Sequence, residues 1–151
     1  MFDIIPVTSD KPTDCGATCM KMLLTYYGDQ ETTLEDLIRE CKTRLIGCTA
    51  ADLMRVGNAH GLEVHAFKTD LDGMLSVDRP AIIWWKKCHW CVFCGIDDEG
   101  RIVICNPDRG RYRMSKSLFR SWYSGVALFN GIPEDIEGQE IIDVYDHIFM
   151  P

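Results

Sequence analysis

The spacing of apolar residues changes from a helical to a strand-like period near Gly61, and this change constrains the fold more than any other feature of the sequence. Before it, apolar residues recur three and four positions apart, as in Met20, Leu23 and Leu24. This spacing predicts a helix that ends at Gly28. After it come short apolar runs that are typical of strands, at residues 62–67, 81–85, 88–96 and 101–106. Helices followed by a mostly antiparallel sheet define an α+β fold.

Hydroxyl residues mark the expected starts of the other helices. Thr33 and Thr49 each precede an aspartate by three positions, which resembles a capping box. Ser115 is expected to cap a short helix through Trp122, and a last strand is expected at residues 126–129. We expect residues 1–129 to form one domain, and the acidic residues 130–151 to be a C-terminal extension of that same domain.

The composition argues against several classes of protein. The 151 residues suffice for one domain with a substantial core, and 46% of them are hydrophobic. The 16 basic and 23 acidic residues give a net charge of −7 without a basic stripe, which argues against a nucleic-acid partner. No apolar run approaches the roughly 18 residues that span a bilayer, so we expect no membrane segment in this chain.

Cysteine usage and the first residues together predict the compartment. The opening stretch MFDIIPVTSDKP lacks the basic start and long apolar run of a secretory signal. We therefore expect a cytoplasmic protein whose eight cysteines are free thiols. Nothing in the sequence indicates an oligomeric state.

Cys15 is the first candidate for chemistry, because it stands at the expected start of the first helix. A helix N-terminus favours the nucleophilic thiolate through its dipole and its unpaired N–H groups. Asp14 suits the N-cap position, and Gly16 has no side chain that would block approach to the sulfur. The alternative is a small buried cysteine that only packs, since free cysteine is among the most often buried residues.

A nucleophilic thiol needs a base, and His89 has the most suitable position among the four histidines. Strand alternation places it on one face with Cys91 and Phe93, although a strand histidine can also serve only a local hydrogen bond. Asn106 ends the next strand and can orient the imidazole, as the third member of a triad does. Asp108 in the following turn is an alternative orienter, although its ordinary role there is turn formation.

Cys88, Cys91 and Cys94 form a C-x2-C-x2-C pattern, which is also found in zinc and iron–sulfur sites. In a strand, successive members of this pattern point to opposite faces and do not converge on one ion. We therefore expect strand thiols there, and neither a metal nor another cofactor.

Three stretches together carry a resemblance to a known family: DCGATCMKMLLTYYG, RPAIIWWKKCHWCVFCGIDDEGRIVICNPDRG and MSKSLFRSWYSGVALF. Their order and spacing over residues 7–129 resemble the C39 and C39-like cysteine peptidases. That family has an Asp-Cys-Gly nucleophile helix, a His-Phe/Trp-x-Val strand and an Asp-Pro turn after the next strand. The resemblance implies a papain-like fold, with the nucleophile at a helix N-terminus packed on the sheet, and a peptide or protein substrate.

By position, the resemblance implies a thiol-dependent peptidase or amide hydrolase with Cys15 as nucleophile, His89 as base and Asn106 as orienter. Asn106 stands where the family usually has aspartate, and its side-chain oxygen can accept from an imidazole, as in papain-type enzymes. The oxyanion hole would combine the Cys15 backbone N–H with Ser9, which stands where the family usually has glutamine. The cleft is expected to be lined in part by Gly16 and Trp90.

These two departures from the family pattern leave other functions open. The loss of one oxyanion donor costs roughly 100- to 1,000-fold in rate, which makes a catalytically weakened module that binds a peptide or leader one alternative. An acyl transferase or transpeptidase with the same residues is the other.

Overall fold

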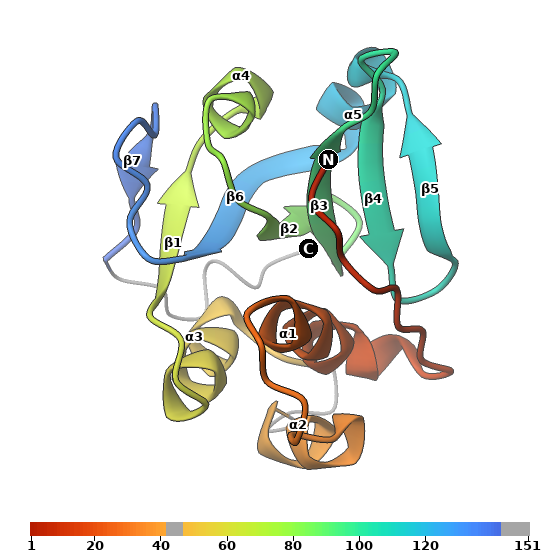
Figure 1. Ribbon diagram of the computed structural model, residues 1–151, viewed down its shortest axis with the longest axis vertical. Helices are drawn as coiled ribbons and strands as arrows, with labels where there is room; N and C mark the ends of the chain where they lie inside the picture. Colours follow the sequence, from red (N-terminus) through yellow and green to blue (C-terminus); the bar gives the residue numbers. More distant parts are fainter. Residues whose placement is uncertain (42–46, 143–151) are drawn as a thin grey trace.

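The computed structural model describes residues 1–41 and 47–142, in which three helices cover one face of a seven-stranded sheet (Figure 1). A 3-10 turn at Pro12–Asp14 leads directly into the first helix. The three helices are α1 (Cys15–Tyr26), α2 (Leu34–Cys41) and α3 (Ala50–Ala59). Most of α1 is buried because it packs on the sheet, with α2 on its other side and α3 beside it, which explains its few charged residues (Figure 1).

The sheet is antiparallel throughout its described pairs, as the α+β prediction requires. Its strands are β1 (Val64–Lys68), β2 (Ala81–Trp85), β3 (His89–Ile96), β4 (Ile102–Asn106), β5 (Gly110–Met114), β6 (Tyr123–Asn130) and β7 (Gln139–Glu140). They are hydrogen-bonded in the order β5-β4-β3-β2-β6-β1-β7. All five residues of β2 are buried, in agreement with its uninterrupted apolar sequence.

Both faces of the sheet are buried, and strand alternation divides the side chains between two cores. Trp90 and Cys94 of β3 belong to the core under α1, α2 and α3. Cys91 and Phe93 belong to the opposite core, together with residues of α4 (Leu71–Leu75) and α5 (Lys116–Trp122). Cys91 and Cys94 thus lie on opposite faces, as predicted, whereas Cys88 is exposed in the preceding turn.

The predicted helix starts are confirmed by side-chain hydrogen bonds. Thr49 and Asp52 form a complete capping box, in which each side chain accepts from the other's backbone N–H at 3.0 Å. The Thr33 hydroxyl accepts from the backbone N–H three residues later at 3.1 Å, and the Ser115 hydroxyl does the same at the start of α5. Each of these helices therefore begins at a position that its local sequence specifies.

The N-terminal segment is tied to the middle of the sheet. The Phe2 N–H donates to the Cys94 carbonyl at 2.7 Å, and the Ser9 N–H donates to the Pro107 carbonyl at 3.0 Å. Between them the Ile4 side chain is fully buried. This segment runs close to β3 in Figure 1. The second of these hydrogen bonds holds Ser9 next to the end of β4, although the two lie far apart in the sequence.

Three elements were not predicted from the sequence: α4, β5 and β7. No strand was expected at the β5 region, but it forms an edge strand in which Arg111 and Arg113 are exposed while Met114 is buried. β7 pairs with β1, so the described part of the C-terminal extension returns to the sheet. Residues 143–151 of that extension lie outside the described residues. No helix within residues 1–41 and 47–142 is long and apolar enough to cross a membrane.

Gly57 allows α3 to lie directly against α1 and β1. A Cβ atom at this position would be 2.5 Å from Cγ2 of Val64 and 3.1 Å from Cε of Met20. We expect Gly57→Ala to lower the free energy of unfolding by about 1–3 kcal/mol through overpacking, although alanine is the better helix former. The measurement is chemical denaturation of the variant and the wild type.

Val64→Ala provides the matched control, because it removes the atom that the new methyl group would meet. In the Val64→Ala background the cost of Gly57→Ala should be clearly smaller, since the two substitutions are coupled. An equal cost in both backgrounds would contradict the proposed steric cause.

Candidate active site

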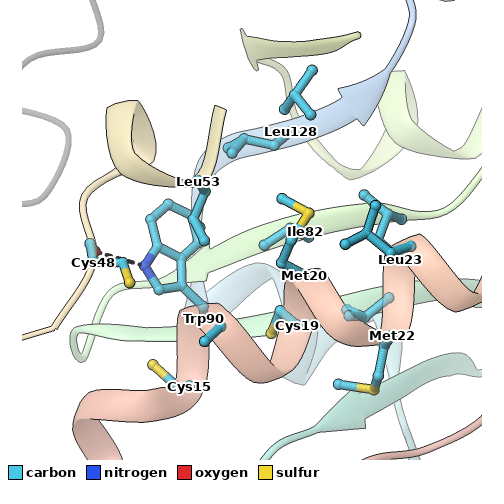
Figure 2. Close-up of a cluster of buried hydrophobic side chains, with 14 of the residues drawn as sticks. Cys15, Cys19, Met20, Met22, Leu23, Cys48, Leu53, Ile82, Trp90 and Leu128 are labelled. Carbon is cyan, nitrogen blue, oxygen red and sulfur yellow. Dashed lines mark hydrogen bonds between the residues drawn. The ribbon is translucent and has the colours of Figure 1, made fainter. Parts of the chain in front are cut away.

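Cys15 is the first residue of α1, and only 7% of its surface is exposed. α1 packs against β3, and the backbone N–H of Trp90 lies beside the Cys15 sulfur. Figure 2 shows Cys15 at the N-terminal end of the helix, next to the indole of Trp90. Since Trp90 directly follows His89 in β3, the thiol is held at the end of the strand that carries the candidate base.

Asp14 occupies the N-cap position of α1, as expected, but its side chain does not cap the helix. Its side chain makes no capping hydrogen bond, and its buried Oδ1 has no partner among the described residues. The helix instead continues from the preceding 3-10 turn, in which the Asp14 N–H donates to the Lys11 carbonyl at 3.0 Å. The Thr18 hydroxyl then donates to the Asp14 carbonyl at 2.8 Å. The position of Cys15 is therefore set by the backbone of the turn.

Burial dominates the chemistry of the resting thiol. It raises the pKa of Cys15 above that of a free cysteine, and the negative charge of Asp108 raises it further. The backbone N–H groups of Trp90 and Gly16 lower this pKa, but their effect is smaller than that of burial. The thiolate that the helix N-terminus was expected to favour is thus not the resting form, and the thiol needs a base to become a nucleophile.

Gly16 and Trp90 form packing contacts rather than the wall of a cleft, contrary to the prediction. A Cβ atom on Gly16 would lie 3.1 Å from Cβ of Cys48 and 3.3 Å from Cδ1 of Trp90. The Trp90 side chain is 1% exposed, and its indole N–H donates to the Cys48 carbonyl at 3.1 Å (Figure 2). The missing side chain of Gly16 therefore admits the indole of Trp90, and this contact brings α1 and β3 together.

The predicted pair of His89 and Asn106 is present. Nε2 of His89 lies 2.8 Å from Oδ1 of Asn106. That oxygen also accepts from the Asp108 backbone N–H at 2.8 Å, while Nδ2 of Asn106 donates to the Tyr112 hydroxyl at 3.4 Å. The backbone donor requires an oxygen at this position, so Nε2 of His89 carries a proton and Nδ1 is the basic nitrogen.

Tyr112 is a site residue that the sequence analysis missed. It lies in β5, where the alternation of arginine, tyrosine and arginine in GRYRM is the signal that indicates an edge strand with one inward side chain. Its hydroxyl holds the amide of Asn106 in the orientation that presents Oδ1 to the imidazole. Tyr112 is therefore a positioning residue for the orienter.

Asp108, the alternative orienter, lies close to the same imidazole. Its Oδ2 is 3.6 Å from Nε2 of His89, while its side chain is 57% exposed. Asn106 is nearer and 7% exposed, so it makes the direct hydrogen bond. The site thus has a neutral amide in direct contact with the imidazole and a carboxylate slightly farther away.

Ser9, the expected oxyanion donor, lies next to the turn that follows Asn106. Its backbone N–H donates to the Pro107 carbonyl at 3.0 Å. Its hydroxyl oxygen is buried and has no hydrogen-bond partner among the described residues. A buried, unpaired hydroxyl is costly in the resting protein, and it is available as a donor for an oxygen that arrives during a reaction.

The arrangement joins a base and its orienter, and it places a thiol at the end of the same strand. No hydrogen bond joins the Cys15 thiol to His89 within the described part of the chain. Catalytic hydrogen bonds of this kind are often long before substrate binds, and they tighten in the complex. The site can therefore support nucleophilic attack by sulfur on a carbonyl, with the imidazole as the proton carrier.

The order of the elements, a helix with an N-terminal cysteine packed on an antiparallel sheet with a histidine and an asparagine, defines a papain-like cysteine peptidase fold. The family model described as peptidase C39 matches residues 4–132. The chain belongs to the peptidase C39 family.

Several of its relatives are transport or secretion proteins, and the chain matches one part of each. The chain is 25% identical over 125 residues to the probable microcin-H47 secretion/processing ATP-binding protein MchF of Escherichia coli, covering 82% of this chain and 18% of the relative. It is 31% identical over 127 residues to the transport/processing ATP-binding protein ComA of Streptococcus pneumoniae, covering 77% and 17%. The chain thus spans about a fifth of the length of these curated relatives.

A solved structure shows the same fold. It is a double glycine motif protease from an AMS/PCAT transporter in complex with the leader peptide, with a TM-score of 0.79 and 22% identity. The match covers 85% of this chain and 91% of the other. The helices and the sheet that position Cys15 and His89 are therefore part of a shared architecture.

The raised pKa of Cys15 leads to a prediction for alkylation. Only the thiolate reacts with iodoacetamide, so labelling of Cys15 should increase between about pH 7 and pH 10 without a plateau near neutral pH. Asp108→Asn should shift this profile to lower pH, because an anion near a thiol raises its pKa and the variant removes that anion. Labelling is measured at each cysteine by mass spectrometry of the digested protein.

Glu99→Gln is the matched control, because it removes an equal charge in the turn between β3 and β4. It should leave the Cys15 profile unchanged. An Asp108→Asn profile that coincides with that of the wild type, or one that moves to higher pH, would refute the electrostatic contact between Asp108 and the thiol.

Proposed function

We propose that this chain is a cysteine peptidase that cleaves a peptide substrate, with Cys15 as nucleophile, His89 as base and Asn106 as orienter. The hydrogen bond between Nε2 of His89 and Oδ1 of Asn106, at 2.8 Å, is the observation that carries the proposal. It leaves the basic nitrogen of the imidazole free for the thiol at the end of the same strand. Membership of the peptidase C39 family supports the same reaction.

The reaction begins when Nδ1 of His89 accepts the proton of the Cys15 thiol and the sulfur attacks the carbonyl carbon of the scissile amide. The imidazolium is stabilised by Asn106 and by the nearby charge of Asp108. The oxyanion of the tetrahedral intermediate accepts from the Cys15 backbone N–H and the Ser9 hydroxyl.

The intermediate collapses when His89 returns the proton to the leaving nitrogen, which breaks the carbon–nitrogen bond and leaves a thioester on Cys15. His89 then takes a proton from water, and the hydroxide attacks the thioester carbonyl carbon. The carbon–sulfur bond breaks, the acid product leaves, and the imidazolium returns its proton to the sulfur, which restores the thiol and the neutral imidazole. Water is the only co-reactant that the reaction consumes.

The substrate class that we infer is a leader-like peptide with two glycines before the scissile bond. One solved structure with this fold is a double glycine motif protease in complex with the leader peptide. A peptide of this kind is therefore the first substrate to test with the present chain.

A second candidate function is a peptide-binding module without turnover. The observation that favours it is the serine at position 9, a short side chain whose buried hydroxyl has no hydrogen-bond partner within residues 1–41 and 47–142. The two functions are distinguished by hydrolysis, because both bind the peptide but only the peptidase cleaves it.

Cys15→Ala should lower kcat for a quenched fluorescent double-glycine peptide by about 10⁴-fold or more, since the nucleophile is lost. Asn106→Ala should lower it by about 100-fold, because the imidazole loses its fixed tautomer. Cys88→Ala, which removes an exposed thiol, is the matched control and should retain full activity.

If the wild type binds the peptide in calorimetry without cleaving it, the binding module is the correct function.

Ser9→Ala tests the oxyanion donor. It should lower kcat by about 100-fold with little change in KM, because the hydroxyl acts only on the charge that develops during the reaction. Thr8→Ala is the control, since Thr8 is an exposed neighbour. An unchanged kcat in Ser9→Ala would show that another group serves the oxyanion.

A further inference from the structure

A pocket of about 360 Å³ opens beside the candidate base, and the proposed triad does not account for it. Its lining includes His89 and Asn106, and Cys15 is not among the described residues that surround it. The other walls come from the end of β2, the turn after β4, β5 and the end of α5. The size lies within the range of ordinary ligand pockets, about 300–1,000 Å³.

The interior of the pocket is aromatic. Trp85, Tyr112 and Trp122 each present a ring to it. The rings of Trp85 and Trp122 meet edge to face, with centroids 5.9 Å apart and an interplanar angle of 86°. The Lys86 N–H donates to the Trp122 carbonyl at 2.8 Å and ties the end of α5 to the end of β2. The pocket is therefore formed before any ligand binds, and it suits a bulky apolar side chain.

The rim of the pocket is basic, although the chain has a net charge of −7. Lys86, Lys87 and Arg109 are its three cations, and all three are exposed. None of them forms an ion pair with any residue that the structure describes. Asp108 is the single carboxylate in the lining, and it lies against His89. The rim thus presents unpaired positive charge to an incoming ligand.

The position of the pocket relative to the base indicates which part of a peptide it holds. A base that accepts the proton of the thiol returns it to the leaving nitrogen, so the chain after the scissile bond must pass the imidazole. The pocket lies alongside His89 and is not lined by Cys15. It therefore lies on the side of the base and away from the sulfur that would hold the acyl group.

We propose that this pocket binds the first two residues after the scissile bond, a bulky apolar residue in the aromatic interior and an acidic residue at the basic rim. The inference rests on the proposed peptidase function and adds specificity for the leaving segment. The charge complementarity of Lys86, Lys87 and Arg109 selects the acidic residue, and the rings of Trp85 and Trp122 select the apolar one.

Binding of the leaving segment can be measured without turnover. The probes are two hexapeptides with a free N-terminus that begin with phenylalanine and then carry either glutamate or lysine, and a third in which glycine replaces the phenylalanine. They are titrated into the Cys15→Ala protein by calorimetry. The glutamate peptide should bind about 10-fold more tightly than the lysine peptide, and replacement by glycine should abolish measurable binding.

Charge reversal at the rim should invert this preference. The Lys86→Glu/Lys87→Glu variant should favour the lysine peptide, whereas Lys68→Glu, a single reversal on β1 outside the pocket, should behave as the parent. Equal binding of the glutamate and lysine peptides, or a preference that the Lys86→Glu/Lys87→Glu variant leaves intact, would overturn the proposal.

Because binding is read without catalysis, the result is independent of the proposed peptidase activity. An active enzyme that binds all three peptides equally would reject the pocket alone. An inactive wild type that still prefers the glutamate peptide would reject the peptidase and retain the pocket.

Discussion

The contact between the indole of Trp90 and the bare backbone of Gly16 determines where the Cys15 thiol lies relative to the strand of His89. The indole lies so close to Gly16 that a methyl group on this residue would crowd it. The indole N–H also donates a hydrogen bond to the Cys48 carbonyl, which fixes the position of the ring. The residue before Trp90 is the candidate base, and the residue before Gly16 is the candidate nucleophile. One packing contact therefore sets the distance between two reacting groups that belong to different elements.

The electrostatics of the site follow from a neutral orienter. Asn106 fixes the tautomer of His89 without contributing a charge, and the charge comes instead from Asp108 at 3.6 Å. Burial raises the pKa of the Cys15 thiol, and the same carboxylate raises it further. Both effects oppose a thiolate in the resting protein.

The sequence predicts those parts of the fold and the site whose signals are local. The helix starts at Thr33, Thr49 and Ser115 were predicted because their capping partners lie three residues away. His89 and Asn106 were paired correctly because they lie on the same face of adjacent antiparallel strands. Each of these predictions rests on residues that are close in the sequence or on adjacent strands.

The features that the sequence did not predict have both local and long-range causes. Asp14 lacks a cap hydrogen bond because the preceding turn sets the helix start. β5 was missed because its arginines face solvent at the edge of the sheet. The aromatic pocket requires the end of α5 to meet the end of β2, a contact between residues more than thirty positions apart.

The long separation between these segments also controls when the site forms. The helical hydrogen bonds of α1 are local, whereas the base, the orienter and Tyr112 meet only after β3, β4 and β5 have paired. Local structure forms faster than long-range strand pairing. A chain that is still folding therefore has the Cys15 thiol but not yet the base that activates it. The thiol becomes a nucleophile only after the sheet has formed. The topology therefore delays catalytic activity until the chain has folded.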